Sequence, residues 1–256
     1  FDGSPARELG ASDEELYGKR RWELPHAGVS QAQWAAHRAQ LEAHEVFQDF
    51  EMQRMGPDGT PQWASISGEP IFDDQGRFTG YRGVARDITE RKRAEGQIQR
   101  LAFYDELTGL PNRRLFHDRI DTALARSRRR QGRMALLYID IDDFKAVNDR
   151  LGHDAGDLLL QEIARRLERC VRKADTVARL GGDEFVVILE DIHGPDDATA
   201  VADKIHHSLQ QPTAIAGHVL NTQASIGIAL HPCDGDDADS LIRHADQRMY
   251  RRKARN

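Results

Sequence analysis

Cysteine is scarce in this 256-residue chain: Cys170 and Cys233 are the only two, and their spacing matches no pattern of metal ligands. A chain with so few thiols is predicted to work in a reducing, cytoplasmic environment. Long apolar runs are also missing, because the most apolar stretches, residues 134–139 and 185–189, are far too short to cross a bilayer. No signal-peptide pattern opens the chain, and Phe1 in place of methionine suggests an excised fragment, so membrane anchors upstream are left open.

The chain also lacks an excess of positive charge, since its formal net charge is −6. A protein that coats nucleic acid needs a basic surface, so no nucleic-acid partner is expected despite the arginine-rich run at 126–130. That run is predicted to solvate a loop or a helix end. Charged residues make up 30% and hydrophobic residues 39%, which is typical of soluble globular protein, and the length allows one large or two modest domains.

The first third of the chain predicts short helices followed by an antiparallel meander of three strands. Turn residues separate the strands, with Pro57-Asp58-Gly59 in the first connection and residues 73–76 in the second. A helix is expected over residues 31–43, and the strands over residues 47–55, 63–71 and 78–85. Six aromatic residues are predicted to form the core of this part: Trp22, Trp34, Phe47, Phe50, Trp63 and Phe78.

The turn Pro57-Asp58-Gly59 and residues 80–89, with the sequence GYRGVARDIT, resemble the C-terminal half of PAS domains. The resemblance covers residues 1–90 and implies a PAS-like sensory domain, with an antiparallel sheet and flanking helices. PAS domains open with two strands, and at most the end of the second precedes Gly3. The N-terminal strands of the sheet are therefore expected to be missing from this chain.

The ligand of this part is left open by the sequence. His26, His37 and His44 are candidates for holding haem, although histidines more often lie on the surface or pack in cores. No cysteine occurs in residues 1–90, which argues against flavin photochemistry through a cysteinyl adduct. We favour a module that relays a signal or dimerises, with a ligand-binding sensor as the alternative.

A polar helix is expected to join the two halves, with residues 91–100 as the linker. Asp87 or Thr89 can cap its first amides. Three apolar residues follow the four-then-three spacing of a short coiled coil: Ala94, Ile98 and Leu101. This seam is short and polar, which favours a lever between domains over a strong dimeriser.

From residue 105 onward helices and strands alternate, which predicts a mixed α/β domain. A hairpin is expected where Gly181-Gly182 separates two apolar strands, because tight hairpin turns need positive φ. Helices are expected at residues 113–130, 158–171 and 198–209 and from residue 238. Strands are expected at residues 134–140, 176–180, 185–189 and 219–230.

Acidic residues stand at two strand ends of this domain. Asp140 ends an apolar strand, and Asp183 and Glu184 are placed at the hairpin tip. If the strands are neighbours, Asp140 and Asp183 meet at one end of the sheet, where hard oxygen ligands suit Mg²⁺. Lys145 can supply positive charge to a triphosphate. Each residue taken singly is better explained as an ordinary solvated side chain, but their combination favours metal-dependent phosphoryl transfer.

The run Gly181-Gly182-Asp183-Glu184-Phe185 matches the signature of the GGDEF family of diguanylate cyclases. Three further segments resemble family motifs in the family's order: residues 105–114 (DELTGLPNRR), 140–145 (DIDDFK) and 148–157 (NDRLGHDAGD). The resemblance covers residues 101–256. It implies a nucleotidyl-cyclase-like central β-sheet surrounded by α-helices, and an enzyme that condenses two GTP molecules into cyclic di-GMP.

The resemblance also implies roles for single residues. The ligands of Mg²⁺, or alternatively of Mn²⁺, would be Asp140, Asp183 and the carbonyl of Ile141. Glu184 would assist at the metals or take the proton from the attacking 3′-hydroxyl. The phosphates of GTP would be held by Lys145, the backbone amides of Asp143 and Phe144, and Lys253. The family carries an arginine four positions after this lysine; that position falls beyond Asn256, and Arg255 stands two positions early.

Base recognition is assigned by the same resemblance. Asn148 and Asp157 would bind guanine, with Leu107 and His153 beside the nucleotide. A carboxylate accepts from both N1–H and the 2-amino group of guanine, a pair of donors that adenine lacks. This chemistry explains why an acidic residue would select GTP over ATP.

The resemblance also implies product control. The run Arg172-Lys173-Ala174-Asp175 fits the RxxD pattern of the family's inhibitory site, and five residues separate Asp175 from Gly181, as in that site. Arginine can bind the O6/N7 edge of guanine, so Arg172 and Asp175 are expected to hold cyclic di-GMP as an inhibitor. A two-fold symmetric product made from two identical substrates predicts a homodimer. The alternative is a non-catalytic nucleotide-binding module that regulates a phosphodiesterase domain following Asn256.

Overall fold

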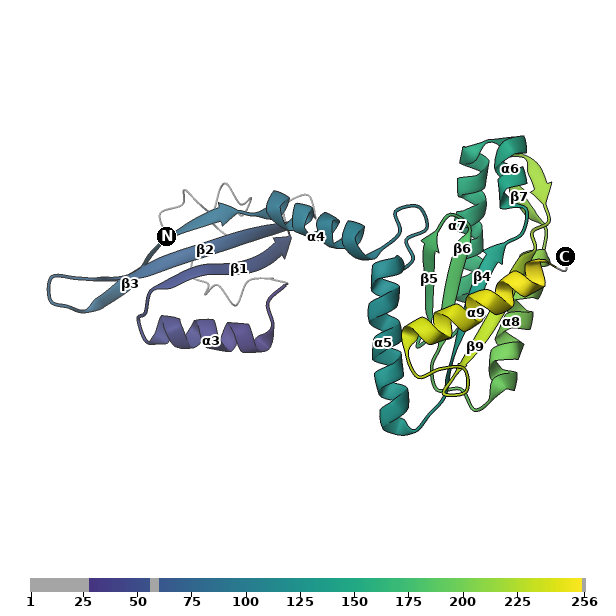
Figure 1. Cartoon of the computed structure of the whole chain (residues 1–256). Helices are drawn as coiled ribbons and strands as arrows, with labels where there is room; N and C mark the ends of the chain where they lie inside the picture. Colours follow the sequence, from purple (N-terminus) through teal and green to yellow (C-terminus); the bar gives the residue numbers. More distant parts are fainter. Residues whose placement is uncertain (1–27, 56–59, 255–256) are drawn as a thin grey trace. The chain divides into compact units, whose positions relative to one another are not determined.

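The computed structural model describes residues 28–55 and 60–254. It divides into two compact units, Phe1–Ile98 and Gln99–Asn256, which are described separately (Figure 1). Among the helices of the described ranges, none combines the length and the apolar character that a membrane span requires.

The first unit is an antiparallel sheet in the order β1-β2-β3 with one helix beside it. Its elements are α3 (Gln31–Glu42), β1 (Phe47–Met55), β2 (Pro61–Phe72) and β3 (Phe78–Asp87). The predicted meander is therefore confirmed; β1 has the predicted bounds, and β2 and β3 extend slightly beyond theirs. The turn at residues 57–59 lies outside the described residues.

Helix α3 begins at a capping box, which explains why it starts where it does. The Gln33 N–H donates to the Ser30 hydroxyl oxygen, and the Ser30 N–H donates back to the Gln33 side chain. The buried face of the helix packs Trp34 and His37 over the sheet. The core that results contains Trp34, Phe47, Met52, Ala64 and Ile66.

The aromatic core prediction is wrong for Phe78. This residue opens the edge strand β3 and is 36% exposed, and its ring stacks at 3.8 Å between centroids on His44, which is also exposed. Trp34 and Phe47 are buried as expected. Trp22, together with the candidate haem ligand His26, lies outside the described residues.

Helix α4 spans Thr89–Phe103 and is longer at both ends than the predicted linker. Of the two candidate caps, Asp87 is used: its carboxylate accepts from the Thr89 N–H at 2.7 Å. The Thr89 hydroxyl instead accepts from the Trp63 N–H at 2.9 Å, which ties the start of the helix to β2. Two apolar residues of the predicted seam are exposed along the helix: Ile98 and Leu101.

The second unit is built around a four-stranded sheet in the order β5-β6-β4-β9, and every neighbouring pair is antiparallel. Its strands are β4 (Met134–Ile141), β5 (Thr176–Gly181), β6 (Glu184–Leu189) and β9 (Ala224–His231), beside a small hairpin of β7 (Thr213–Ile215) and β8 (His218–Leu220). Its helices are α5 (Arg113–Arg130), α6 (Phe144–Leu151), α7 (His153–Cys170), α8 (Pro195–Gln210) and α9 (Ala238–Lys253). The predicted central sheet surrounded by helices is confirmed.

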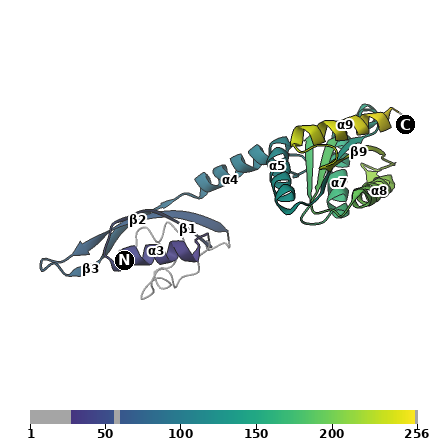
Figure 2. The ribbon, with the colours of Figure 1, turned by 60° about the horizontal axis from the view of Figure 1, so that its bottom comes forward.

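Helices cover both faces of this sheet, with α9 on the side opposite α7 and α8 (Figure 2). Alternate residues of β4 enter two cores: Leu136 and Tyr138 pack with α5 and α9, whereas Leu137 and Ile139 pack with α7 and α8. All of β4 is buried, so its register is fixed from both sides. The position of the residues at its end is therefore determined by the core.

Two predicted elements in this unit have wrong boundaries, and one helix was not predicted. The strand expected at 219–230 is interrupted, because β8 ends at Leu220 and β9 begins at Ala224. The helix expected from residue 158 begins at His153. A separate helix, α6, precedes it, and the two are divided by Gly152 with a φ of 87°, a conformation that favours glycine.

Candidate active site

The site begins at the end of β4, where Asp140 is paired across the sheet with Glu184 of β6. The β5–β6 turn contains only Gly182, with a φ of 54°, and Asp183. The Ile141 N–H donates to the backbone carbonyl of Asp183 at 3.3 Å. The structure thus brings Asp140 and Asp183 together at one end of the sheet. Glu184, expected at the hairpin tip, is instead the first residue of β6.

A cation lies directly against Asp140. The Asp140 side chain is only 11% exposed, and its Oδ1 is 2.5 Å from Nζ of Lys253 on α9. Burial raises the pKa of the Asp140 carboxyl, the bond from Lys253 opposes this, and the negative charge of Asp183 adds to the rise. The same bond raises the pKa of Lys253. Positive charge at this position therefore stabilises the ionised carboxylate.

A glycine on β9 allows α9 to reach this point. A Cβ added at Gly227 would lie 1.9 Å from the carbonyl oxygen of Ala245 and 2.4 Å from the backbone nitrogen of Met249. Both are backbone atoms of α9, so the helix could not stay in place against any larger residue. The close approach carries the last turn of α9, with Lys253, to the end of β4.

The donor set suits a divalent cation that arrives with a nucleotide. Within residues 28–55 and 60–254, no group of three or more His, Cys, Asp or Glu side chains is arranged to hold a metal alone. Asp140 and Asp183 nevertheless offer hard carboxylate oxygens beside the backbone of Ile141. Mg²⁺ commonly takes one or two carboxylates and completes its shell with waters and substrate phosphates. These residues fit that pattern better than a closed metal cage.

The start of α6 faces the same end of the sheet. Asp143 precedes the helix with a φ of 57°, and its side chain makes no capping hydrogen bond. The first N–H groups of a helix lack intrahelical partners and attract anions. Phe144 packs against the core beneath α7, and exposed Lys145 has no acidic partner among the described residues. Residues 143–145 can therefore offer amides and one ammonium group to phosphates.

A buried polar atom marks the candidate base site between α6 and α7. Oδ1 of Asn148 is buried without a hydrogen-bond partner among the described residues. A Cβ at Gly156 would lie 1.8 Å from that oxygen, so this glycine makes room for the amide. Asp157 follows Gly156 and is exposed. The acceptor of Asn148 and the carboxylate of Asp157 therefore lie on two helices that pack against each other, α6 and α7.

Two further predicted residues lie at the edges of this base site. His153 is the first residue of α7 and is exposed. Leu107 is partly buried against the core that contains α7, and its carbonyl accepts from Nε2 of Gln161 at 3.1 Å. Leu107 is therefore held to α7 by the backbone and offers an apolar surface nearby.

The sequence did not predict two residues that contact Glu184. Arg113 of α5 lies 3.9 Å from its carboxylate. Tyr138, on the same face of β4 as Asp140, hydrogen-bonds to Glu184; burial first, and then the negative charge of Glu184, raise the pKa of the tyrosine. Both contacts depend on tertiary packing, and no local sequence signal identifies them.

Arg179 of β5 was also missed, although it supports the hairpin turn. It donates to both carboxylate oxygens of Asp105, at 2.9 and 3.2 Å, and to the carbonyl of Gly182 at 2.7 and 3.0 Å. Burial raises the pKa of Asp105, but hydrogen bonds from Thr108 and Arg179 outweigh it and hold that pKa below its ordinary value. The guanidinium thus joins the segment after α4 to the turn that carries Asp183.

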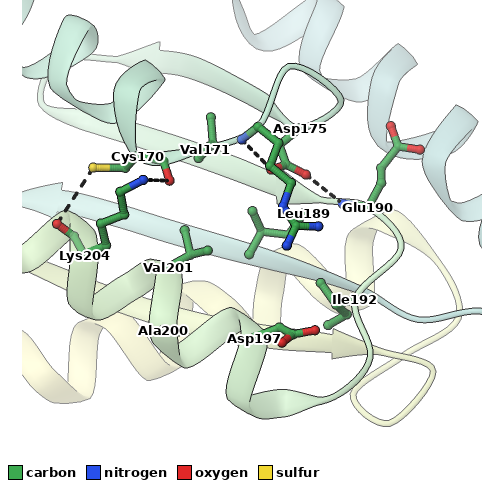
Figure 3. A pocket seen from close by; sticks show the side chains of 11 residues that line it. Cys170, Val171, Asp175, Leu189, Glu190, Ile192, Asp197, Ala200, Val201 and Lys204 are labelled. Carbon is green, nitrogen blue, oxygen red and sulfur yellow. Dashed lines mark hydrogen bonds between the residues drawn. The ribbon is translucent and has the colours of Figure 1, made fainter.

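Arg172 and Asp175 form a tight turn between α7 and β5. The Asp175 carboxylate accepts from the Arg172 N–H at 2.9 Å and from the Glu190 N–H at 3.3 Å. The turn lines a cavity of about 310 Å³, and Lys204 of α8 lies on its other wall (Figure 3). The ammonium of Lys204 donates to the Cys170 carbonyl at 3.0 Å, which holds it in place.

A second cavity, of about 340 Å³, shares the same turn. It is lined by Arg172 and Asp175 and also by Arg126 and Arg130 of α5. The arginine-rich run at 126–130, expected to solvate a loop or a helix end, therefore contributes two arginines to this cavity, where Arg126 pairs with Glu190 and Arg130 pairs with Asp191. Sequence reasoning missed these arginines and Lys204 because they are distant from Arg172 along the chain.

Comparison with known proteins gives two family matches. The description "Diguanylate cyclase, GGDEF domain" matches residues 102–256, and "PAS domain" matches residues 5–90. Over 165 residues the chain is 47% identical to the bifunctional diguanylate cyclase/cyclic di-GMP phosphodiesterase MucR of Pseudomonas aeruginosa, which covers 64% of this chain and 24% of that protein. Over 157 residues it is 45% identical to diguanylate cyclase TpbB of the same organism, covering 60% and 36%. The chain thus spans well under half of each relative.

Solved structures agree with these matches. The GGDEF domain of TpbB, also called YfiN, from Pseudomonas aeruginosa aligns with a TM-score of 0.57 and 43% identity, over 58% of this chain and 93% of that one. The coiled coil and GGDEF domain of DgcB from Caulobacter crescentus, in complex with c-di-GMP, aligns with a TM-score of 0.59 and 27% identity, over 65% and 89%. Because the first family model spans more than half of the chain and coincides with the unit that holds the site, the chain belongs to the GGDEF family of diguanylate cyclases, with a PAS domain ahead of its GGDEF domain.

Proposed function

We propose that this chain condenses two molecules of GTP into cyclic di-GMP and releases two pyrophosphates, with Mg²⁺ as the metal and Mn²⁺ as a substitute. The observation that carries the proposal is the convergence at one end of the sheet. Asp140 and Asp183 meet beside the start of α6, and Asn148 holds an unpartnered oxygen at the adjacent helix pair. Family membership and a relative solved with c-di-GMP support the same activity.

The chemistry joins each ribose 3′-oxygen to the α-phosphorus of the other GTP. The bond from that phosphorus to the bridging oxygen of the β-phosphate breaks, and the 3′-hydroxyl proton passes to a carboxylate. We assign this proton to Glu184, because Glu184 pairs with Asp140 across the sheet and contacts Arg113 and Tyr138. When bound, the metal would neutralise charge on the transferring phosphoryl group. Lys145 and the amides of residues 143–144 would bind the remaining phosphates.

Selection of guanine would come from the pair formed by Asn148 and Asp157. The Asp157 carboxylate can accept from N1–H and the 2-amino group, and Leu107 can pack against the base. A base that lacks these donors would leave the buried oxygen of Asn148 unpaired, which disfavours that base. ATP is therefore expected to be a poor substrate.

The decisive experiment is incubation of the full chain with GTP and Mg²⁺, with chromatographic separation of the nucleotides. Wild type is expected to form cyclic di-GMP, whereas Asp183→Ala and Asp140→Ala are expected to form none, because each loses an anionic metal ligand. A folded wild-type protein that makes no cyclic di-GMP would refute the enzyme. Near-native turnover by either folded variant would refute the metal assignment.

A non-catalytic module that controls a phosphodiesterase domain is the second candidate. Similarity to MucR, whose name includes both activities, and to the cyclic di-GMP phosphodiesterase NbdA of the same organism, at 35% identity, motivates it. Calorimetric binding of GTP without turnover would favour this function. The presence of both Asp183 and Glu184 favours the cyclase. The free thiols of Cys170 and Cys233 support a cytoplasmic location for either function.

Product control and assembly complete the proposal. The cavity at Arg172 and Asp175 suits a ligand with guanine edges and phosphates, because arginines surround an acceptor carboxylate there. Cyclic di-GMP is the candidate inhibitor. A homodimer of GGDEF domains would supply the second GTP, since one set of Asp140, Asp183 and Lys145 activates only one substrate.

A further inference from the structure

The outer edge of the catalytic sheet carries a basic cavity that none of the roles above uses. Strand β9 ends the sheet, and α9 packs along it (Figures 1 and 2). Between them lies a cavity of about 350 Å³. It is lined by Ile226, Gly227, Ile228, Arg248, Arg251 and Arg252, and we call it the α9 arginine cavity. Its lining contains three cations and no acidic residue.

The three arginines stand at i, i+3 and i+4 on α9 and therefore share one face of the helix. Arg248 is neutralised by Asp234, which accepts from both of its terminal nitrogens at 2.6 and 2.7 Å. Arg251 and Arg252 are exposed, and their side chains make no hydrogen bond or ion pair within the described part of the chain. Two adjacent guanidinium groups are thus left without a counter-charge at the mouth of a cavity.

Side chains at this edge of the sheet hinder the pairing of an additional strand. Arg248 donates to the Ile228 carbonyl at 2.6 Å, and Asp234 accepts from the Leu230 N–H at 2.8 Å. These side chains occupy backbone groups that a pairing strand would need, as in other protected sheet edges. An occupant must therefore be small enough to fit beside the backbone and anionic enough to meet two guanidinium groups.

We propose that the α9 arginine cavity binds a diphosphate-type anion, either inorganic pyrophosphate or the diphosphate arm of a nucleotide, between Arg251 and Arg252. Guanidinium groups bind phosphate oxygens bidentately, so two of them match two linked phosphates. The inference does not depend on cyclase activity, because it uses no residue of the metal, base or product-control sites.

A nearby histidine provides an independent reporter of the bound anion. Burial, and secondly the positive charge of Arg252, lower the pKa of His206 on α8. A diphosphate held at Arg252 would oppose that positive charge. The pKa of His206 is therefore expected to rise when the cavity is filled.

The test is calorimetric titration of the full chain with pyrophosphate in EDTA, which removes divalent metal. Wild type is expected to bind, and R251A/R252A to bind at least tenfold more weakly. The matched control R93A/R100A removes two exposed arginines of α4 and is expected to bind as wild type does. Parallel titration with GDP identifies the source: a GDP affinity that also requires Arg251 and Arg252 assigns the nucleotide arm, and binding of pyrophosphate alone assigns the inorganic anion.

Two outcomes would overturn the proposal: absence of pyrophosphate binding by wild type, or equal binding by R251A/R252A. NMR of the imidazoles of the wild-type protein gives a second test that does not depend on whether the variant folds. Saturating pyrophosphate should raise the pKa of His206, and a pKa unchanged at saturation would place the anion elsewhere.

Discussion

At the scale of single residues, the candidate base site depends on a missing side chain. Gly156 faces Asn148, and the amide oxygen of Asn148 occupies the space that a Cβ would take. Glycine costs helix stability relative to alanine, so its presence in α7 needs a reason in packing. Room for the Asn148 amide is such a reason.

Gly156→Ala is therefore expected to impair substrate binding without unfolding the protein. The new methyl group would push the Asn148 amide out of place, and loss of about one hydrogen bond corresponds to roughly a tenfold rise in KM for GTP. Urea unfolding should show unchanged or slightly higher stability, because alanine favours helix. Gly96→Ala in α4, where an added Cβ meets nothing within 4 Å, is the control. An unchanged KM would show that Asn148 does not bind the base.

At the scale of elements, the turn after β9 is fixed to α9 by Asp234 and Arg248. The bond from Arg248 lowers the pKa of Asp234, and only 15% of the aspartate side chain is exposed. A carboxyl whose pKa is lower in the folded state than in the unfolded state stabilises the fold fully when the pH is above its unfolded-state pKa, near 3.8. That stabilisation is lost as the pH falls through the lower, folded-state pKa. The pair should therefore stabilise the fold at neutral pH and not in strong acid.

Asp234→Asn is expected to lower the free energy of unfolding by about 1–2 kcal/mol at pH 7, since it removes a charge-assisted bond. The difference from wild type should shrink steadily once the pH drops below 3.8. Denaturant melts at a series of pH values measure it. Asp191→Asn, which breaks the exposed pair with Arg130, should change little at any pH. A deficit that persists unchanged in acid would mean that the ion pair is not its cause.

The sequence predicted elements well where local signals are strong. Strand β1, the β5–β6 hairpin and α5 are bounded by turn, glycine or cap residues, and the structure has them at nearly the expected residues. Helix α6 was missed because it has only eight residues, although Phe144, Val147 and Leu151 stand at helical spacing and pack against the core. The contact between Lys253 and Asp140 joins residues far apart in the chain. Its geometry depends on Gly227, and no spacing rule could have predicted it.

At the scale of the whole molecule, the proposed reaction needs two nucleotides that face each other. Specific activity should rise with protein concentration and level off when dimers saturate, because each GGDEF domain would bind one GTP. Initial rates across a concentration series, compared with sedimentation data on the same samples, test this. A proven monomer whose specific activity does not depend on concentration would contradict it.

Arg172→Ala is expected to raise the concentration of cyclic di-GMP needed for half-inhibition by at least tenfold. The variant removes the guanidinium that would bind the O6/N7 edge of guanine. Lys173→Ala, an exposed neighbour in the same turn that does not line the cavity, is the matched control and should be inhibited as wild type is. Equal inhibition of all three proteins would place product control elsewhere.

The two borders of the catalytic sheet also constrain how copies of the chain can meet. On the β5 side, the Arg179 N–H already donates to the Pro111 carbonyl at 3.0 Å, and on the β9 side Arg248 and Asp234 occupy backbone groups. Joining two sheets into one continuous sheet would require breaking these bonds. Copies that pair as proposed are therefore expected to meet through helices and loops, and the occupied edges also disfavour strand-mediated aggregation.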